Sequence, residues 1–377
     1  MASFWLLDEP RARPAVALPG PPDAIVVGGG VTGCSCALAL ASRGLRVRLH
    51  EAREIASGAS GRNGGFALRG GAMPYDDAVR DLGRDAAQAL WRLSERALDT
   101  IESLAGDALR RVGSLRLAVD ESELDDLRDE AAALEADGFR LEWLHELPAP
   151  LQGLFAGGFR HPGDGALHPA RWVRRLALHA AAAGAAVCEH SRVETLEELK
   201  APHVVVATDG YTHGLVPELD AAIQPTRGQV VVTEPLEAQL FPSPHYARYG
   251  YDYWQQLPDR RLVLGGSRDA ALDDESTAEE AVTPVVQERL EAAVARLTGV
   301  RPVVEHRWSG IWGTTSDLRP LVGRVPGRDG VWVAAGYSGH GNVLGFACGE
   351  LVGRAIAGED VPELALFDPV RLLAAPA

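Results

Sequence analysis

Lysine and cysteine are scarce in this sequence of 377 residues. It has one lysine, Lys200, and four scattered cysteines, Cys34, Cys36, Cys188 and Cys348. The net charge of −15 argues against a nucleic-acid partner, because phosphate binding needs a surplus of Arg and Lys. The C-x-C spacing has no second pair to complete a metal site, so we expect no metal and interpret the cysteines as small buried side chains.

Long apolar runs are also absent. None reaches the roughly 20 residues that a helix needs to cross a bilayer. The first 23 residues lack the basic segment followed by an apolar segment that is typical of a signal peptide. We therefore expect a protein of the reducing cytoplasm without membrane contact.

Glycine, in contrast, is abundant. The sequence has 41 glycines, above the average usage of about 7%, so its backbone makes many close approaches. Apolar residues make up 46%, enough for a large core, and the length predicts two domains, successive or interleaved.

A first glycine-rich segment lies between short apolar runs. Ala24–Val27 is predicted to be a strand, Gly28-Gly-Gly-Val-Thr-Gly33 a turn, and Cys34 to Leu45 a helix. A second strand, Val47–His50, follows and ends at Glu51. This order of strand, glycine turn, helix, strand and acid is typical of dinucleotide-binding proteins.

Each residue of this pattern has a physical task. Gly28 allows the tight turn, Gly30 lets a pyrophosphate approach the backbone, and Gly33 lets the helix lie close to the strand. The helix N-terminus presents free N–H groups to the anion. Glu51 lies 18 residues after Gly33 and can accept hydrogen bonds from a ribose diol. The pattern alone does not separate NAD from FAD.

The segment Gly58-Ala-Ser-Gly-Arg-Asn-Gly-Gly-Phe66 follows soon after the first turn. Its small residues can pass close under a flat ring, while Arg62 can neutralise a phosphate or approach the ring and Asn63 can donate to a polar ring edge. A flavin is large and stays bound, so the protein must line its ribityl chain and ring as well as its phosphates. We therefore predict that the first loop holds the pyrophosphate and the second seats the isoalloxazine; the alternative is a flexible surface loop.

Further elements are predicted from periodicity. We expect helices at Asp77 to Leu104 and Glu121 to Asp137, a strand at Ser114–Val119, and antiparallel strands at Gln224–Thr233, Arg248 to Gln255 and Arg261 to Gly265. In Tyr249-Gly-Tyr-Asp-Tyr253 the tyrosines alternate, so all three are expected on one face of a strand, with Trp254 on the other. The phenols could line an amine pocket or form the aromatic core of a sheet.

Four segments together resemble one family: SFWLLD near the N-terminus, IVVGGGVTG, GASGRNGG and GYSGHG at 336–341. They resemble FAD-dependent amine oxidoreductases of the D-amino-acid oxidase/sarcosine oxidase (DAO) superfamily, closest to the gamma-glutamylputrescine oxidoreductase-like branch. The resemblance covers nearly the whole chain. It implies an α/β fold with a Rossmann-like FAD-binding domain (GR2-type) and an interleaved α+β substrate domain built on an antiparallel sheet. The FAD domain would comprise residues 1–75, 150–215 and 308–377, and the substrate domain residues 76–149 and 216–307.

The resemblance also suggests cofactor contacts beyond the two loops. Val193 would pack against the adenine, the strand and turn Val204-Val-Val-Ala-Thr-Asp-Gly210 would lie below the cofactor, and the helix from Asn342 to Ala357 would point its positive end at the pyrimidine side of the flavin. The complete set of expected FAD contacts is Gly28, Gly30, Val31, Thr32, Gly33, Glu51, Ala52, Arg53, Ser60, Gly61, Arg62, Asn63, Gly64, Gly65, Val193, Ala207, Thr208, Gly210, Gly339, His340, Gly341 and Asn342.

Departures from the family pattern refine the expectation. Some relatives hold the flavin covalently on a cysteine or histidine that is missing from Trp308 to Thr315 and from the second loop, so non-covalent FAD is expected. Where sarcosine-oxidase-like relatives have a lysine that activates oxygen, Val263 stands nearest, which argues against fast oxidase chemistry. Amino-acid-specific relatives place a carboxylate-binding arginine near Trp312, so a simple alpha-amino acid is disfavoured unless Arg62, Arg69 or Arg268 substitutes.

The sequence thus predicts an FAD-dependent oxidoreductase acting on CH-NH or CH-NH2 donors. A primary or secondary amine would lose hydride to flavin N5, and the imine would hydrolyse. Candidate residues at the reaction site are His340, Tyr251, Tyr253 and Trp312, and His340 could instead simply stabilise its turn. Partners would be a small-molecule amine and an electron acceptor, O2 or another carrier, with a monomer or small homo-oligomer. Alternatives are a D-amino-acid or glycine-type oxidase or dehydrogenase of this fold, an FAD-holding subunit with little activity, and an NAD-dependent dehydrogenase.

Overall fold

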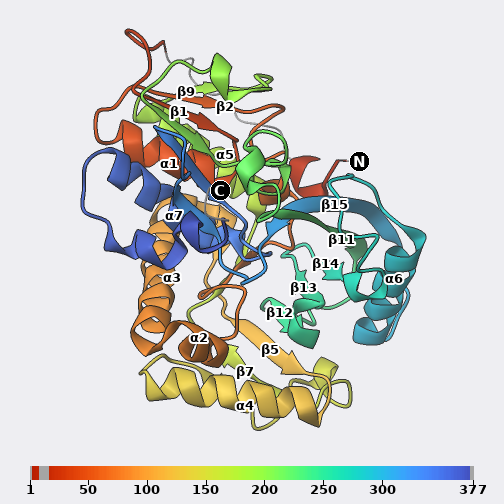
Figure 1. Cartoon of the computed structure of the whole chain (residues 1–377). Helices are drawn as coiled ribbons and strands as arrows, with labels where there is room; N and C mark the ends of the chain where they lie inside the picture. The colour runs from red at the N-terminus through yellow and green to blue at the C-terminus, as the bar shows by residue number, and fades with distance from the viewer. Residues whose placement is uncertain (1, 8–16, 374–377) are drawn as a thin grey trace.

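The computed structural model describes residues 2–7 and 17–373 (Figure 1). The described residues do not include Asp8 of SFWLLD or residues 9–16, which belong to the N-terminal stretch in which we expect no signal peptide. Among those described, no helix is both long and apolar enough to cross a membrane.

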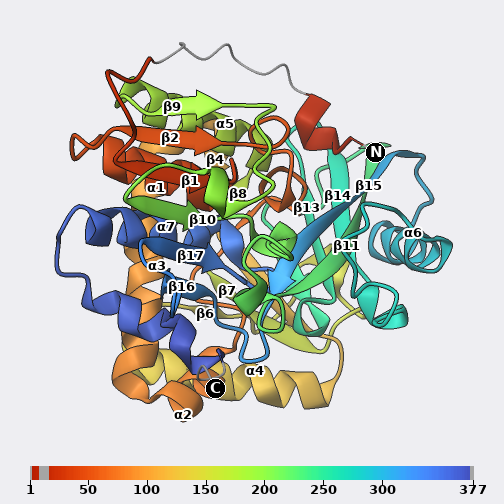
Figure 2. The ribbon, with the colours of Figure 1, turned by 45° about the horizontal axis from the view of Figure 1, so that its top comes forward.

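A six-stranded sheet forms the first layer, in the order β16, β17, β10, β1, β2, β9, as Figure 2 shows. All neighbouring pairs are parallel except β16 with β17. The strands are β1 (Ala24–Val27), β2 (Val47–His50), β9 (Ala186–Cys188), β10 (His203–Val206), β16 (Leu321–Arg324) and β17 (Val331–Ala335). Every side chain of β1 is buried, as expected for a parallel strand covered on both faces.

Three helices cover one face of this sheet (Figure 1). They are α1 (Val31–Ala41), α5 (Pro169–Ala182) and α7 (Gly341–Ile356). The other face packs on Val216, Leu219 and Ile223 from the segment that leads to the second sheet. The predicted strand, turn, helix and strand from residue 24 to residue 50 are confirmed, since β1, α1 and β2 follow one another as expected.

An eight-stranded sheet forms the second layer, in the order β15, β11, β14, β13, β12, β5, β7, β6. It is antiparallel except between β12 and β5. Its strands are β5 (Ser114–Ala118), β6 (Glu142–Trp143), β7 (Gly157–His161), β11 (Gln224–Pro235), β12 (His245–Ala247), β13 (Asp252–Gln256), β14 (Arg261–Gly266) and β15 (Val304–Thr314). Helix α6 (Pro284–Thr298) covers one face, where Val286 and Leu290 join the same core as Trp254.

The remaining elements connect the two layers. A small sheet consists of β3 (Phe66–Ala67), β8 (Gly165–Leu167) and β4 (Leu109–Arg110). Between β3 and β4 the chain forms helices α2 (Tyr75–Leu82) and α3 (Arg84–Ala105), and between β4 and β8 it forms helix α4 (Glu121–Ala136). The single helix predicted from Asp77 to Leu104 is wrong in one respect, because it is two helices. Gly83 separates them with a φ of 86°, a conformation that a helix cannot contain and that glycine adopts without strain.

Two strands lie in a different layer from the one predicted. The predicted division assigns residues 150–215 and 308–377 to the cofactor domain, but β7 pairs with β5 and β15 pairs with β11 along its length, both in the eight-stranded sheet. Residues 308–314 therefore continue the antiparallel sheet before the chain returns to the six-stranded one.

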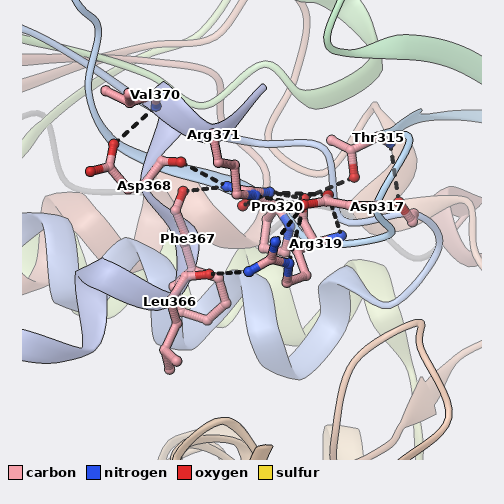
Figure 3. A network of polar contacts seen from close by, with 10 residues as sticks. Thr315, Asp317, Arg319, Pro320, Leu366, Phe367, Asp368, Val370 and Arg371 are labelled. Atoms are coloured by element: carbon pink, nitrogen blue, oxygen red, sulfur yellow. Dashed lines mark hydrogen bonds and ion pairs between the residues drawn. The ribbon is translucent and has the colours of Figure 1, made fainter. Parts of the chain in front are cut away.

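The C-terminal segment is tied to the loop between β15 and β16 (Figure 3). The Arg371 guanidinium donates to the backbone oxygens of Arg319 and Pro320 at 2.6 and 2.9 Å and pairs with Asp317 at 2.7 Å. Arg319 in turn donates to Leu366 O at 3.3 Å. This network fixes a loop that includes Leu318, one of the residues on the wall of a cavity of about 1040 Å³.

Candidate active site

Three glycine-rich turns meet at the edge of the six-stranded sheet. The Ser60 hydroxyl accepts from Val31 N at 3.0 Å, which joins the second loop to the first turn of α1. The Asn63 amide donates to Asn342 Oδ1 at 3.0 Å, which joins the same loop to the first turn of α7. The first turn also lies against the end of β10. A Cβ at Gly28 would come within 2.4 Å of the backbone oxygen of Ala207, the residue that follows this strand. The predicted convergence of 28–33, 58–66 and 336–341 is therefore present.

A cavity of about 1040 Å³ opens between these turns and the second sheet. Its wall includes all four candidate reaction-site residues and nineteen of the twenty-two expected FAD contacts. The three exceptions are Gly33, Gly61 and Gly65. Gly33 acts behind the wall, because a Cβ there would lie 1.9 Å from Gly28 O and would push α1 away from the turn.

Glu51 occupies the end of the cavity next to β2. Its carboxylate accepts hydrogen bonds from Gly29 N at 2.7 Å and from Arg53 N at 2.8 Å. These contacts fix the carboxylate beside the first turn, where it can also accept from a sugar diol. Val193 lines the same cavity.

Arg62 and Asn63 hold the second loop in place. The buried Arg62 guanidinium donates to Ser309 O at 3.1 Å and pairs with Glu280 at 3.1 Å. The Asn63 Oδ1 atom accepts from Gly65 N at 2.8 Å. The predicted contacts of Arg62 and Asn63 with phosphate and flavin ring stay predictions. Both side chains also have protein partners, which no local sequence pattern indicates.

Asp209 links three segments and was missed by sequence reasoning. Its carboxylate accepts from Gly313 N at 3.0 Å and from Gly336 N at 2.8 Å, and so ties the end of β10 to β15 and to the third glycine turn. Burial raises the pKa of Asp209, although these N–H groups oppose the shift. The signal that could have found it is an acid at the end of a buried strand.

His340 occupies the N-cap position of α7, without a capping hydrogen bond from its side chain, and lies on the cavity wall. Its Nδ1 atom is buried and has no hydrogen-bond partner among the described residues. Burial, helped by the charge of Arg116 and opposed by the backbone of Ser338, lowers the pKa of His340 to about 4, so the imidazole is neutral at pH 7. The Tyr246 ring lies edge-on to it with ring centres 5.9 Å apart.

The predicted alternation of three tyrosines on one strand is wrong. Arg248 and Tyr249 have φ values of 54° and 52°, so the chain turns there and β13 begins only at Asp252. Tyr249 is 60% exposed and its hydroxyl donates to Asp126 at 2.6 Å. Tyr249, Tyr251 and Tyr253 nevertheless all reach the cavity wall. Trp254 points to the opposite side, into the core under α6, as predicted.

Tyr246 completes this aromatic wall and was not predicted. Burial raises the pKa of both Tyr246 and Tyr253, so their phenols stay neutral. Gly64 lies directly against Tyr253, and a Cβ there would come within 2.8 Å of the ring. Small residues thus form the floor of the cavity, and aromatic side chains form one part of its wall.

These residues fit FAD. The glycine turns leave a floor without side chains, α1 presents its N-terminus, the Glu51 carboxylate could accept from a ribose, and the wall includes the unpartnered Nδ1 of His340. A mostly parallel sheet with this floor, facing an antiparallel sheet with an aromatic wall, defines a Rossmann-type flavin-dependent oxidoreductase.

Comparisons with known proteins identify the family of this chain. The chain belongs to the DAO family of FAD dependent oxidoreductases, which matches residues 23–355. It is 30% identical to gamma-glutamylputrescine oxidoreductase of Escherichia coli, over 89% of this chain and 82% of that protein. It is 26% identical to the probable oxidoreductase OrdL of Haemophilus influenzae, over 93% and 86%. The crystal structure of glycine oxidase from Geobacillus kaustophilus has the same fold, with a TM-score of 0.77, 24% identity, and coverage of 95% and 100%.

Proposed function

We propose that this FAD-dependent oxidoreductase oxidises the C–N bond of a primary or secondary amine. Bound FAD would accept hydride from the α-carbon of the neutral amine. Water would then hydrolyse the imine to a carbonyl compound and ammonia, for a primary amine, or a smaller amine, for a secondary one, and O2 or another carrier would take up the two electrons. Non-covalent binding is part of the proposal, because Trp308 to Thr315 has no cysteine and the second loop, residues 58–66, has no histidine.

The aromatic wall opposite the three glycine turns is the observation that carries this proposal. Tyr246, Tyr251, Tyr253 and Trp312 lie on it and are uncharged, so an ammonium group entering there loses water without gaining a carboxylate. Desolvation disfavours the charged form of an amine, and the neutral amine is the form that can release hydride. The wall also limits the orientations that an amine can adopt against the flavin.

His340 is proposed to orient rather than to remove a proton. Because its pKa is about 4, it is a weak base at pH 7. Its free Nδ1 can exchange one hydrogen bond with the cofactor or the amine, which would satisfy an otherwise unpartnered buried atom.

Anaerobic mixing of the purified holoprotein with amines tests the proposal. Polyamines, N-methyl amino acids and D-amino acids are added in turn, and the flavin absorbance band at ~450 nm is followed. We expect at least one of them to bleach it, while free FAD with the same amine keeps its colour. Readmission of air then reports the rate of reaction with O2, and absence of bleaching with every amine would contradict the proposal and favour an FAD-holding subunit.

A further inference from the structure

Among the residues that the structure describes, the wall of the cavity contains one guanidinium without an ion-pair or hydrogen-bond partner. Four arginines line it, and three are neutralised: Arg53 and Arg62 by Glu280, at 2.8 and 3.1 Å, and Arg192 by Glu194 at 2.8 Å. The guanidinium of the fourth, Arg268, forms no hydrogen bond and no ion pair with any residue that the structure describes, although its backbone oxygen accepts from Ala271 N at 3.0 Å. A guanidinium facing a cavity with all its donors free is a ready site for an anion.

Two aromatic rings hold the Arg268 guanidinium. Its central carbon lies 4.9 Å from the centre of the Tyr251 ring and 5.9 Å from that of Trp312, both within the range of cation–π attraction. Stacking on ring faces orients the planar fork but uses none of its N–H groups. The rings therefore fix the direction of Arg268 and leave its donors for a ligand.

The backbone before Arg268 is built for this position. Ser267, directly after β14, has a φ of 56°, and its N–H donates to Tyr251 O at 2.5 Å. The neighbouring carboxylate of Asp269 is turned away and pairs with Arg248 instead. A left-handed non-glycine residue costs conformational energy, and such residues are concentrated at functional sites.

Each described carboxylate on the same wall already has a partner within the protein. Glu51 and Asp209 accept backbone N–H groups, and Glu194 pairs with Arg192. The described part of the wall therefore offers no free carboxylate to a second ammonium group of a diamine, whereas it offers a free guanidinium to an anion.

The other two arginines considered as replacements for a carboxylate anchor are excluded by their contacts. Arg62 is paired with Glu280. Arg69 is buried between Asp164 and Glu95, both at 2.9 Å, and is not on the cavity wall.

We infer that Arg268, held between Tyr251 and Trp312, is a specificity-determining residue that binds a carboxylate of the substrate. The inference rests on the proposed function and adds that the amine is a carboxylate-bearing one, such as an N-substituted amino acid, rather than a simple diamine. The anchor comes from the segment after β14, not from the Trp312 position on β15.

Binding of benzoate and of its neutral isostere benzamide to the holoprotein tests the charge of the site. Perturbation of the flavin absorbance reports both ligands without turnover. We expect wild-type protein to bind benzoate more tightly than benzamide. Arg268→Met should weaken the affinity for benzoate by about ten- to a hundredfold and leave the affinity for benzamide unchanged. Arg268→Lys should retain part of the affinity for benzoate.

Arg324→Met is the matched control. Arg324 also stacks on an aromatic ring, Trp332 at 4.8 Å, but it is exposed and lies outside the cavity wall. It should bind benzoate as the wild type does. Equal affinity of the wild type for benzoate and benzamide, no response to benzoate, or an unchanged affinity in Arg268→Met would overturn the inference.

Flavin reduction by N-methylglycine and by its amide separates this inference from the proposed function. Preference for the acid, lost in Arg268→Met, supports both. Equal reduction by acid and amide in both proteins leaves amine oxidation standing and removes the anion site. If neither amine bleaches the flavin but benzoate binding still depends on Arg268, the anion site stands and amine oxidation is the part that fails.

Discussion

Individual residues were predictable where their task depends on sequence neighbours. The first glycine turn and Glu51 follow directly from their spacing, and the structure places them together. Arg62 and Asn63 were located but their partners were not, because Glu280 and Asn342 lie more than two hundred residues further along the chain. A local pattern contains no information on which distant carboxylate will neutralise a given arginine.

Gly33 allows a test of close packing at a single residue. A Cβ there would meet Gly28 O at 1.9 Å and the Val26 side chain at 3.3 Å. Gly33→Ala should therefore destabilise the protein by about 1–3 kcal/mol, although alanine otherwise favours a helix, and should lower the flavin content. Urea unfolding and the ratio of flavin to protein absorbance measure both effects.

Gly71→Ala is the control for Gly33→Ala. A Cβ at Gly71 would have its nearest neighbour, a Leu90 methyl, at 3.7 Å, which is ordinary contact. Its stability should stay within about 0.5 kcal/mol of the wild type. Similar behaviour of the two variants would show that α1 can move away from the first turn at little cost.

At the scale of elements, periodicity predicted type and approximate position well and failed where one residue interrupts the pattern. The apolar spacing from Asp77 to Leu104 continues across Gly83, so the break between α2 and α3 was not visible. The alternating tyrosines were mistaken for a strand because left-handed residues at 248 and 249 do not alter side-chain spacing in the sequence. In both cases the backbone conformation decided the outcome.

The pairing of β12 with β13 gives a prediction on pH. His245 lies opposite Trp254 and stacks on it, with ring centres 5.0 Å apart and an angle of 11° between the rings. Burial lowers the pKa of His245 to about 3, from an ordinary value near 6.5. Between these two values the unfolded chain binds a proton that the folded protein does not, so stability is greatest above pH 6.5 and falls as the pH decreases.

The size of this effect follows from one proton. Near pH 5 the free energy of unfolding should fall by about 1.4 kcal/mol per pH unit from His245 alone. His245→Phe keeps an aromatic ring against Trp254 and should remove that part of the slope, while His161 and His340 continue to contribute. Urea titrations at several values between pH 5 and pH 7.5 measure the slope. The exposed His145→Gln serves as control, and a slope unchanged in His245→Phe would rule out this assignment.

At the scale of the whole molecule, the α/β class, the Rossmann-like layer and the antiparallel second layer were predictable, but the path of the chain between them was not. The sequences of residues 157–161 (GGFRH) and 308–314 (WSGIWGT) do not indicate one layer over the other, and only strand pairing assigns them to the eight-stranded sheet. Side chains from both layers meet at the cavity, so the site depends on contacts that hold the layers together.

Glu280 is the clearest of these contacts. It lies in the segment between β14 and α6 and binds three side chains of the cofactor layer: Arg53, Arg62 and the hydroxyl of Tyr211. Burial opposes its ionisation, but the hydrogen bond from Tyr211 and the charges of Arg62 and Arg53 outweigh it and lower the pKa of Glu280. The carboxylate is therefore charged at pH 7 and joins the two layers beside the cavity.

Neutralising Glu280 should loosen this junction. Glu280→Gln leaves two arginines without their counter-charge in a partly buried place, so we expect a loss of about 1–3 kcal/mol in stability and faster release of FAD on dilution. Glu279→Gln removes the same charge from an exposed neighbour and should change neither. The recovery of flavin fluorescence after dilution measures release, and thermal unfolding with and without added FAD measures stability. If Glu280→Gln retains FAD as well as Glu279→Gln does, the cofactor layer holds its ligand without help from the second sheet, and the junction serves folding alone.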